Sequence, residues 1–199
     1  MAATPHSRPP ITTVILAGGQ GKRMGGDKGL QVLHGRALIA WVKEAVAGQS
    51  DEVLLSANDK HEVYAGLGCR VIADETLDWA GPLAGLQAVM RKARNELVMS
   101  VPCDTPFLPA DLIGRLHGAL GDAEAAVVLV AGRRQPAITL YRKVVLKKLD
   151  AYLAAGGRKV NDWLNSLQLR EVEFEEAEEF ANINSQQELA SANKLQHKR

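Results

Sequence analysis

The sequence predicts an α/β fold with a doubly wound, mostly parallel central sheet. Over roughly the first 120 residues, apolar strand segments alternate with segments of helical periodicity. These strand segments are apolar almost throughout, as expected for parallel strands that helices cover on both faces. The chain has 199 residues, of which 46% are hydrophobic and 24% charged, as in an ordinary globular domain. We therefore expect a single domain over residues 11–199, preceded by a flexible tail over residues 1–10.

Each element is predicted from its local pattern. Strands are predicted where β-branched and apolar residues cluster, and helices where apolar residues recur every three or four positions or where proline opens a segment. The predicted strands are Ile11–Ala17, Glu52–Ala57, Cys69–Asp74, Glu96–Pro102, Ala125–Ala131, Ala137–Tyr141 and Leu169–Glu176, the last as a half-buried edge strand. The predicted helices are Arg36–Ala47, Pro82–Arg94, one opening at Pro109, Lys143–Ala155 and one from Ser185 to about Leu195.

Composition and charge exclude several classes of function. The formal net charge is only +1, which argues against a nucleic-acid or membrane partner. The longest apolar run, Ala125–Ala131, is far shorter than the roughly 20 residues that cross a bilayer. Residues 1–10 lack the apolar segment of a secretion signal. Cys69 and Cys103 form no CxxC pair and fit a reducing compartment, so we expect a cytoplasmic protein.

Polar residues follow the carboxyl ends of the first four long strands. Those ends read LAGG, SAND, IADE and VPCDTP, so Asn58, Asp74 and Asp104 each follow a strand and the remaining end enters a glycine loop. In open α/β sheets, ligands bind outside the carboxyl ends of the strands. This convergence predicts a binding site at that edge of the sheet.

The glycine loop, LAGGQGKRMGGDK over residues 16–28, has a composition suited to polyphosphate. Glycine admits positive φ and lets backbone N–H groups converge on an anion, and Lys22, Arg23 and Lys28 add positive charge. The loop is neither a Walker A motif nor a dinucleotide fingerprint, because Leu16 and Met24 stand where those motifs need glycine. A surface loop with solvated charges is the alternative.

Several segments in this order resemble the molybdenum cofactor guanylyltransferases, the MobA family of nucleotidyltransferases. They are VILAGGQGKRMGGDK, GPLAGL at 81–86, VPCDTPFLP at 101–109 and NINSQQEL at 182–189. The resemblance covers almost the whole chain. It implies a three-layer Rossmann-like nucleotidyltransferase fold. It also implies transfer of GMP from GTP to molybdopterin, or its molybdenum form, with release of pyrophosphate.

The resemblance implies roles for residues on the nucleotide side. Arg23 and Lys28 would be catalytic countercharges at the phosphates. Asp104 would be the metal ligand, because a carboxylate beside a polyphosphate needs an intervening cation such as Mg²⁺. The candidate nucleotide-binding residues are Leu16, Ala17, Gly18, Gly19, Lys28, Asn58, Asp74 and Asp104. For each of them an ordinary loop or surface role stays open.

On the acceptor side, Asn182 and Asn184 resemble a family segment placed near molybdopterin, and Arg158 and Lys159 are candidates for contacting the acceptor's phosphate. We expect a monomer that makes transient contacts with cofactor-insertion chaperones and molybdoenzymes. Two kinds of alternative remain. One is a related enzyme that uses CTP or acts on a sugar phosphate, and the other is a GTP-binding module without catalysis.

Overall fold

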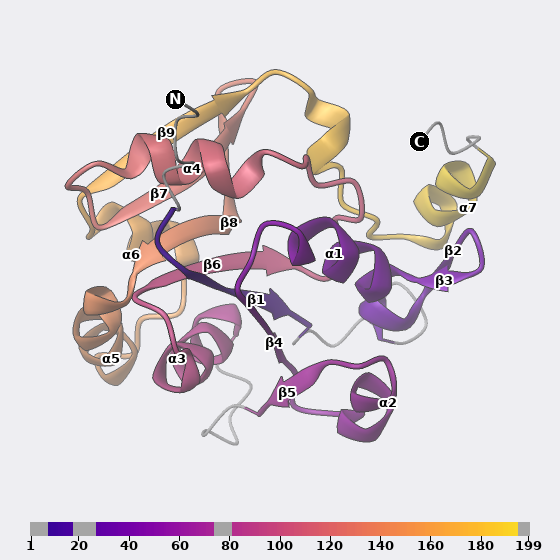
Figure 1. Ribbon diagram of the computed structural model, residues 1–199, viewed down its shortest axis with the longest axis horizontal. Coiled ribbons are helices and arrows are strands. Elements are labelled where there is room, and N and C mark those ends of the chain that lie inside the picture. Colours follow the sequence, from indigo (N-terminus) through magenta and orange to yellow (C-terminus); the bar gives the residue numbers. More distant parts are fainter. Residues whose placement is uncertain (1–7, 18–26, 74–80, 195–199) are drawn as a thin grey trace, which may run out of the picture.

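The computed structural model describes residues 8–17, 27–73 and 81–194 and has helices on both faces of a central sheet (Figure 1). Within these residues the sheet has seven strands in the order β5-β4-β1-β6-β8-β7-β9. They are β1 (Ile11–Leu16), β4 (Glu52–Ser56), β5 (Arg70–Ile72), β6 (Leu97–Pro102), β7 (Ala125–Val130), β8 (Arg133–Arg142) and β9 (Leu169–Phe174). Only β8 runs antiparallel to its neighbours in this sheet. The predicted mostly parallel sheet is confirmed, and the edge strand predicted over Leu169–Glu176 is present but ends at Phe174.

The helices form two layers, one on each face of the sheet. Alternate residues of a strand point to opposite faces, so Ile11 and Ile15 of β1 join one apolar core and Val14 joins the other. The first core contains residues of α1 (Leu38–Ala47), α2 (His61–Gly66) and α4 (Leu112–Leu120). The second contains residues of α3 (Pro82–Lys92), α5 (Leu146–Ala154) and α6 (Val160–Asn165). No helix among the described residues is long and apolar enough to cross a membrane.

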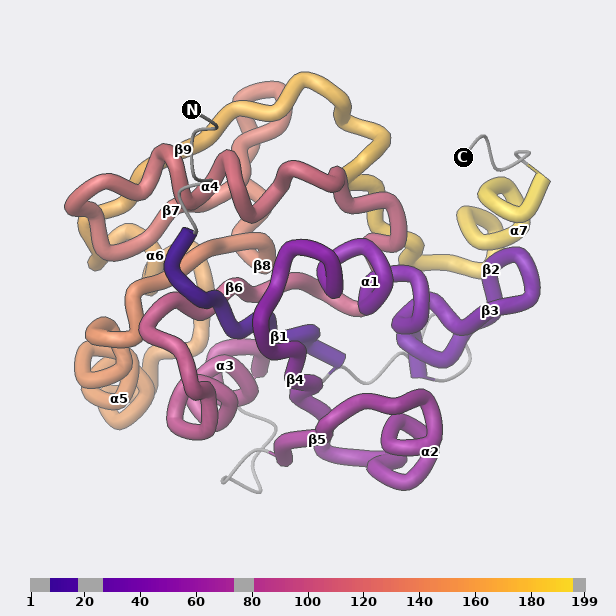
Figure 2. Tube along the Cα trace, viewed as in Figure 1, coloured from indigo at the N-terminus to yellow at the C-terminus, as the bar shows by residue number. Residues whose placement is uncertain are grey.

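A third, smaller core lies beside the main sheet, where the C-terminal helix meets a hairpin. Helix α7 (Gln186–Lys194) packs against the two-stranded β2–β3 hairpin (Val32–Leu33 and Arg36–Ala37), as Figure 2 shows. Leu33, Leu38 and Leu189 are buried in this cluster. The cluster therefore holds the chain just before α7 close to the chain just after the glycine loop.

The register of the parallel strands aligns their carboxyl ends. Leu16 at the end of β1 pairs with both Ser56 of β4 and Pro102 of β6, and Ser56 pairs with Ile72 at the end of β5. The four segments that the sequence singled out therefore leave the sheet side by side. Strand register alone therefore brings the candidate site segments to the same edge of the sheet.

Several boundaries differ from the predicted ones for identifiable reasons. Helix α1 begins at Leu38 because Arg36–Ala37 pair with β2 instead of extending the helix. Pro109 does not open α4, which begins at Leu112 after a turn in which the Leu112 N–H donates to the Pro109 carbonyl. Lys143–Val145 form a 3₁₀ turn before α5. The short elements α2, α6, η1 (Lys28–Leu30) and η3 (Ala177–Phe180) were not predicted, because they are too short to show a period.

Candidate active site

The centre of the candidate site is the ammonium group of Lys28. Its Nζ donates to Asp104 Oδ2 at 3.1 Å and to Asn184 Oδ1 at 2.6 Å. Lys28 belongs to η1, Asp104 to the turn after β6 and Asn184 to the segment before α7. In the sequence, Asp104 is 76 positions and Asn184 is 156 positions away from Lys28. The Asp104 side chain is 9% exposed and that of Lys28 31% exposed. The contact is therefore shielded on the Asp104 side and open on the Lys28 side.

Asp104 is held by the backbone on both of its sides. The Cys103 N–H donates to the Leu16 carbonyl at 3.1 Å and so extends the pairing of β6 with β1. The Asp104 carbonyl accepts from the Ile183 N–H at 2.9 Å. Beside it, the buried Thr105 hydroxyl donates to Asn182 Oδ1 at 2.5 Å. The segment with Asn182 and Asn184 is thus docked directly along the segment with Asp104.

Asn184 is oriented by the start of α7. The Ser185 hydroxyl accepts from the Glu188 N–H at 3.2 Å, and the Glu188 carboxylate accepts from the Asn184 N–H at 2.6 Å. Together they resemble a capping box, in which side chains satisfy the unpaired N–H groups at a helix start. Ile183 of the same segment is buried in the cluster with Leu33.

Lys28 is placed by the residue before it. Asp27 caps η1: its Oδ1 accepts from the Gly29 N–H at 3.1 Å and from the Tyr64 hydroxyl at 2.6 Å. Burial, followed by the hydrogen bond to Asp27, raises the pKa of Tyr64, so the phenol stays protonated and remains a donor. Sequence reasoning missed Asp27 and Tyr64. The only signal was Asp27 itself, inside the quoted loop.

Further candidates for nucleotide binding lie at the ends of the neighbouring strands. Ala17 continues from β1, where its N–H donates to the Ser56 carbonyl at 2.9 Å, and the partly buried Leu16 precedes it. Asn58 lies two positions beyond the end of β4, on the exposed connection to α2. Gly81 precedes α3 with φ of +80°, which glycine tolerates best, and Pro82 takes the first helical position as predicted.

Other candidates lie elsewhere or outside the described residues. The Arg158 guanidinium donates to the carbonyls of Leu153 and Gly157, and the Lys159 carbonyl accepts from the Tyr152 hydroxyl, so these contacts close the connection between α5 and α6. The remaining candidates, on the glycine loop and after β5, lie outside the described residues: Gly18, Gly19, Arg23 and Asp74.

The oxygen atoms at the site fit a hard divalent cation. Asp104 and Asn184 already offer a carboxylate and an amide oxygen to one positive centre, the Lys28 ammonium. Among the described residues, no three His, Cys, Asp or Glu side chains cluster as an all-protein metal cage would require. Mg²⁺ does not need such a cage, because it usually binds one or two carboxylates and completes its shell with phosphate oxygens and water.

Comparison with known proteins decides the family. The model of the MobA-like NTP transferase domain matches residues 13–172. The chain belongs to this family. The MobA-like chain is also 48% identical to the molybdenum cofactor guanylyltransferase of Burkholderia vietnamiensis, over 92% of this chain and 95% of that protein. It is 43% identical to the protein of the same name from Cupriavidus metallidurans, over 92% and 94% of the two chains.

Solved structures share the fold of this MobA-like chain at lower sequence identity. Molybdopterin-guanine dinucleotide biosynthesis protein A from Archaeoglobus fulgidus superposes with a TM-score of 0.77 at 22% identity, covering 92% of this chain and 97% of that one. 4-Diphosphocytidyl-2C-methyl-D-erythritol synthase from Anaerococcus prevotii superposes with a TM-score of 0.73 at 15% identity, covering 94% and 97%. The nucleotidyltransferase fold expected from the sequence is therefore confirmed.

Proposed function

We infer that this chain transfers GMP from GTP to molybdopterin, or its molybdenum form, and releases pyrophosphate to form the guanine dinucleotide cofactor. Family membership and the names of relatives at 43–48% identity support this activity. The structural observation that carries it is the Lys28 ammonium, which Asp104 and Asn184 share. A nucleotide-side candidate and an acceptor-side candidate thus meet at one point, as transfer between two substrates requires.

The reaction needs positioning and charge stabilisation more than covalent chemistry. The acceptor's phosphate is already an anionic nucleophile, so no enzyme-bound intermediate is required. Lys28 would offset the charge that develops at the transferred phosphate, and Arg23 of the glycine loop would add a second cation. Asp104 would hold the metal, with Asn184 close by, and Mg²⁺ would supply charge neutralisation at the phosphate oxygens. The glycine loop would cradle the phosphates with its backbone N–H groups.

The base is proposed to bind beside the ends of β1, β4 and β5. Leu16, Ala17, Gly18 and Gly19 would line the guanosine, and Asn58 and Asp74 would contact base or ribose. Related cytidylyltransferases tend to carry alanine in place of Gly18, and the missing Cβ would leave room for a purine. Because a single methyl group is involved, Gly18→Ala should change the GTP-over-CTP preference by only about 1–3 kcal/mol. An unchanged preference in competition assays would remove Gly18 as a selector.

The acceptor is proposed to bind beside Asn182 and Asn184, opposite the nucleotide. Hydrogen bonds from Thr105 and Ile183 fix this segment against Asp104, which gives the acceptor a defined approach. Arg158 and Lys159 stay candidates for the acceptor's phosphate, although Arg158 would first have to give up its contacts with the carbonyls of Leu153 and Gly157.

The decisive experiment supplies the purified protein with Mg²⁺, molybdopterin and each of the four NTPs, and identifies the dinucleotide by mass spectrometry. We expect product from GTP and loss of activity with a chelator, restored by added Mg²⁺. Product from CTP alone would instead support the cytidylyltransferase alternative. No product with any NTP, together with retained GTP binding, would support a non-catalytic module. Chelator-resistant activity would contradict the metal role of Asp104.

The cellular setting is proposed on chemical grounds. Cys69 and Cys103 are both free thiols, which suits a reducing cytoplasm. A pterin that oxidises easily should be handed on directly, so we propose transient contacts with insertion chaperones and molybdoenzymes by a monomeric enzyme. Gel filtration with light scattering tests the oligomeric state.

A further inference from the structure

We propose that Tyr64 and Asp27 are positioning residues that hold Lys28 in its catalytic place. The inference rests on the proposed function, since the role of Lys28 in the transfer is part of it. Asp27 and Tyr64 do not act on substrate in this proposal. They act by fixing the position of Lys28.

Asp27 holds the backbone on both sides of Lys28. Asp27 Oδ1 accepts two hydrogen bonds, one from the Gly29 N–H and one from the Tyr64 hydroxyl. These two bonds flank Lys28, because they fix the residue before it and the residue after it. The backbone of Lys28 is thereby held in η1, and the direction in which its long side chain leaves the chain is set. A lysine side chain has four rotatable bonds, so a fixed origin is what allows its ammonium to meet two acceptors reproducibly.

Tyr64 is fully buried in the core that also contains Ile39, Leu55 and Cys103. A phenol in such a place cannot exchange its partner for water, and leaving it unpaired would cost free energy. The hydroxyl therefore stays paired with Asp27 Oδ1, and this bond ties Asp27 to a side chain that is packed in the core.

The backbone at Gly29 lies very close to the Tyr64 hydroxyl. A Cβ built on Gly29 would lie 2.9 Å from Tyr64 Oη, nearer than real side chains approach, and 3.5 Å from Cys103 Sγ. A side chain at position 29 would therefore push against the Tyr64 hydroxyl that bonds to Asp27, and glycine avoids this contact. Gly29 and Tyr64 are thus structurally coupled although they are far apart in the sequence.

The test is a double-mutant cycle between Tyr64→Phe and Lys28→Met. Tyr64→Phe removes one oxygen and keeps the ring in the core. We expect kcat to fall roughly tenfold and KM for GTP to stay within about threefold, because a misplaced catalytic group costs transition-state stabilisation more than ground-state binding. In the Lys28→Met background the same change should have no further effect, because the group that Tyr64 positions is gone.

Tyr141→Phe is the matched control. Tyr141 is also a fully buried tyrosine, but it belongs to the core on the opposite face of the sheet. Its substitution should leave kcat unchanged even where it lowers stability by a similar amount, which urea unfolding of all variants will measure. Asp27→Asn, which keeps an acceptor oxygen, should retain more activity than Asp27→Ala.

Each outcome decides between the two levels of inference. If Tyr64→Phe lowers kcat by the same factor with and without Lys28, or by no more than Tyr141→Phe, the positioning role is overturned. If the wild-type protein forms no dinucleotide at all, the proposed function fails instead. Should Tyr64→Phe reduce folding, the comparison of Asp27→Asn with Asp27→Ala still tests the proposal.

Discussion

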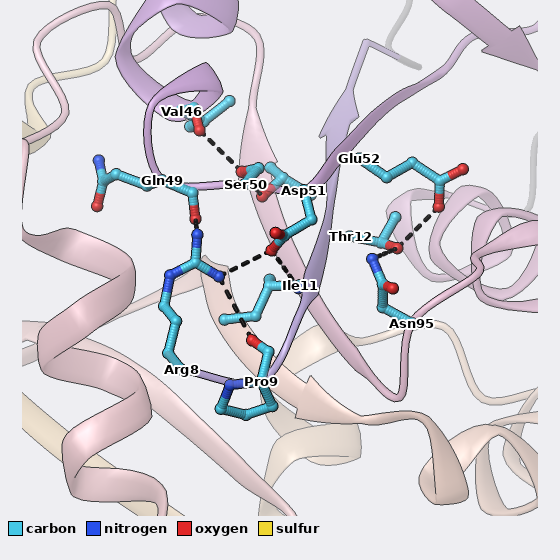
Figure 3. A network of polar contacts seen from close by, with 11 residues as sticks. Arg8, Pro9, Ile11, Thr12, Val46, Gln49, Ser50, Asp51, Glu52 and Asn95 are labelled. Atoms are coloured by element: carbon cyan, nitrogen blue, oxygen red, sulfur yellow. Dashed lines mark hydrogen bonds and ion pairs between the residues drawn. The ribbon is translucent and has the colours of Figure 1, made fainter. Parts of the chain in front are cut away.

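The two ends of the parallel strands carry polar networks of different kinds. At the carboxyl ends, Lys28, Asp104 and Asn184 contact one another through side chains from three distant segments. At the amino ends, Arg8 and Asp51 bond mainly to backbone groups: Asp51 Oδ2 accepts from the Ile11 N–H at 2.8 Å and from Arg8 Nη1 at 2.9 Å (Figure 3). Arg8 also donates to the carbonyls of Pro9 and Gln49.

The difference indicates a division of labour between stability and chemistry. At the amino ends the side chains satisfy backbone N–H and C=O groups where strands begin, so their removal exposes unpaired backbone. At the carboxyl ends the strand pairing is complete without the three side chains, so their removal alters a charge cluster and leaves the ladder intact. Activity and stability should therefore respond oppositely to substitutions at the two ends.

The largest expected effect is that of Asp104→Asn on activity. The amide keeps the shape and still offers an oxygen to Lys28, but it removes the negative charge proposed to hold the metal. We expect kcat to fall roughly 100- to 1,000-fold, as when one preorganised electrostatic group is lost. The free energy of unfolding should change by less than about 1 kcal/mol. Initial rates of pyrophosphate release and urea unfolding measure the two quantities.

Asp51→Asn is the matched control at the other end. It makes the same chemical change in a residue that contacts Arg8 and the Ile11 N–H. Its kcat should equal that of the wild type. Equal losses of activity in the two variants would contradict the division between the ends.

Gly29→Ala should produce the next largest effect, this time on stability. The new Cβ would press on Tyr64 Oη from 2.9 Å, and overpacking of this kind costs about 1–3 kcal/mol. In the Tyr64→Phe background the cost should be smaller, because the oxygen that is struck is absent. Calorimetry of both pairs measures the difference. Gly118→Ala in α4, where a Cβ meets nothing within 4 Å, should be neutral or stabilising.

The sequence predicted the central residues of the candidate site, Lys28 and Asp104, but not the residues that position them. The carboxyl-end rule and the resemblance together placed Lys28 and Asp104 at one edge, and strand register does bring the segments there. Asp27 and Tyr64 were missed because a contact between residues 37 positions apart leaves no local spacing to find. Tyr64 also lies in a helix of six residues, which is too short for an apolar period to identify its buried face.

The polar network at the amino ends of the strands, formed by Arg8, Asp51 and the backbone of Ile11 and Gln49, was missed for a different reason. Proline and small residues predicted a tail over residues 1–10, and nothing in that composition indicates that Arg8 reaches Asp51 and Gln49. The segment Asn182–Asn184 was found only through resemblance. It docks through one backbone hydrogen bond, from Ile183 to Asp104, and through side-chain bonds to Thr105 and Lys28, which are too far away in the sequence to leave a local pattern. Tertiary contacts of this kind are set by how distant segments meet.

A smaller effect is expected from the pH dependence of Asp51. The hydrogen bond from the Ile11 N–H, assisted by Arg8, holds the pKa of Asp51 below its usual value. A carboxyl whose pKa is lower in the folded state stabilises the fold above its ordinary pKa of about 3.9, and this contribution is lost as the pH falls through the folded-state pKa. Asp51 is 47% exposed, so solvent screening limits the contribution to about 1 kcal/mol near pH 7.

The stability difference between wild type and Asp51→Asn should therefore shrink as the pH is lowered below about 4. Urea unfolding at a series of pH values measures it. A difference that stayed constant down to low pH would mean that the carboxylate's charge does not contribute. Arg8→Gln should reproduce part of the loss, because Arg8 is the second group that favours the ionised form.

Thr12→Val should give the smallest effect. It tests how much the side-chain bonds of Thr12, at the amino end of β1, contribute to stability. The buried Thr12 hydroxyl donates to Glu52 Oε2 at 2.8 Å and accepts from Asn95 Nδ2 at 3.1 Å (Figure 3). Valine has nearly the same shape, so only these two bonds are lost. Glu52 Oε2 keeps its bond from the Arg94 N–H at 3.0 Å, and Asn95 is partly exposed and can turn to water. The loss should thus be about 0.5–1 kcal/mol with kcat unchanged. A loss above about 2 kcal/mol would mean that Thr12 links β1, β4 and β6 as one cooperative unit.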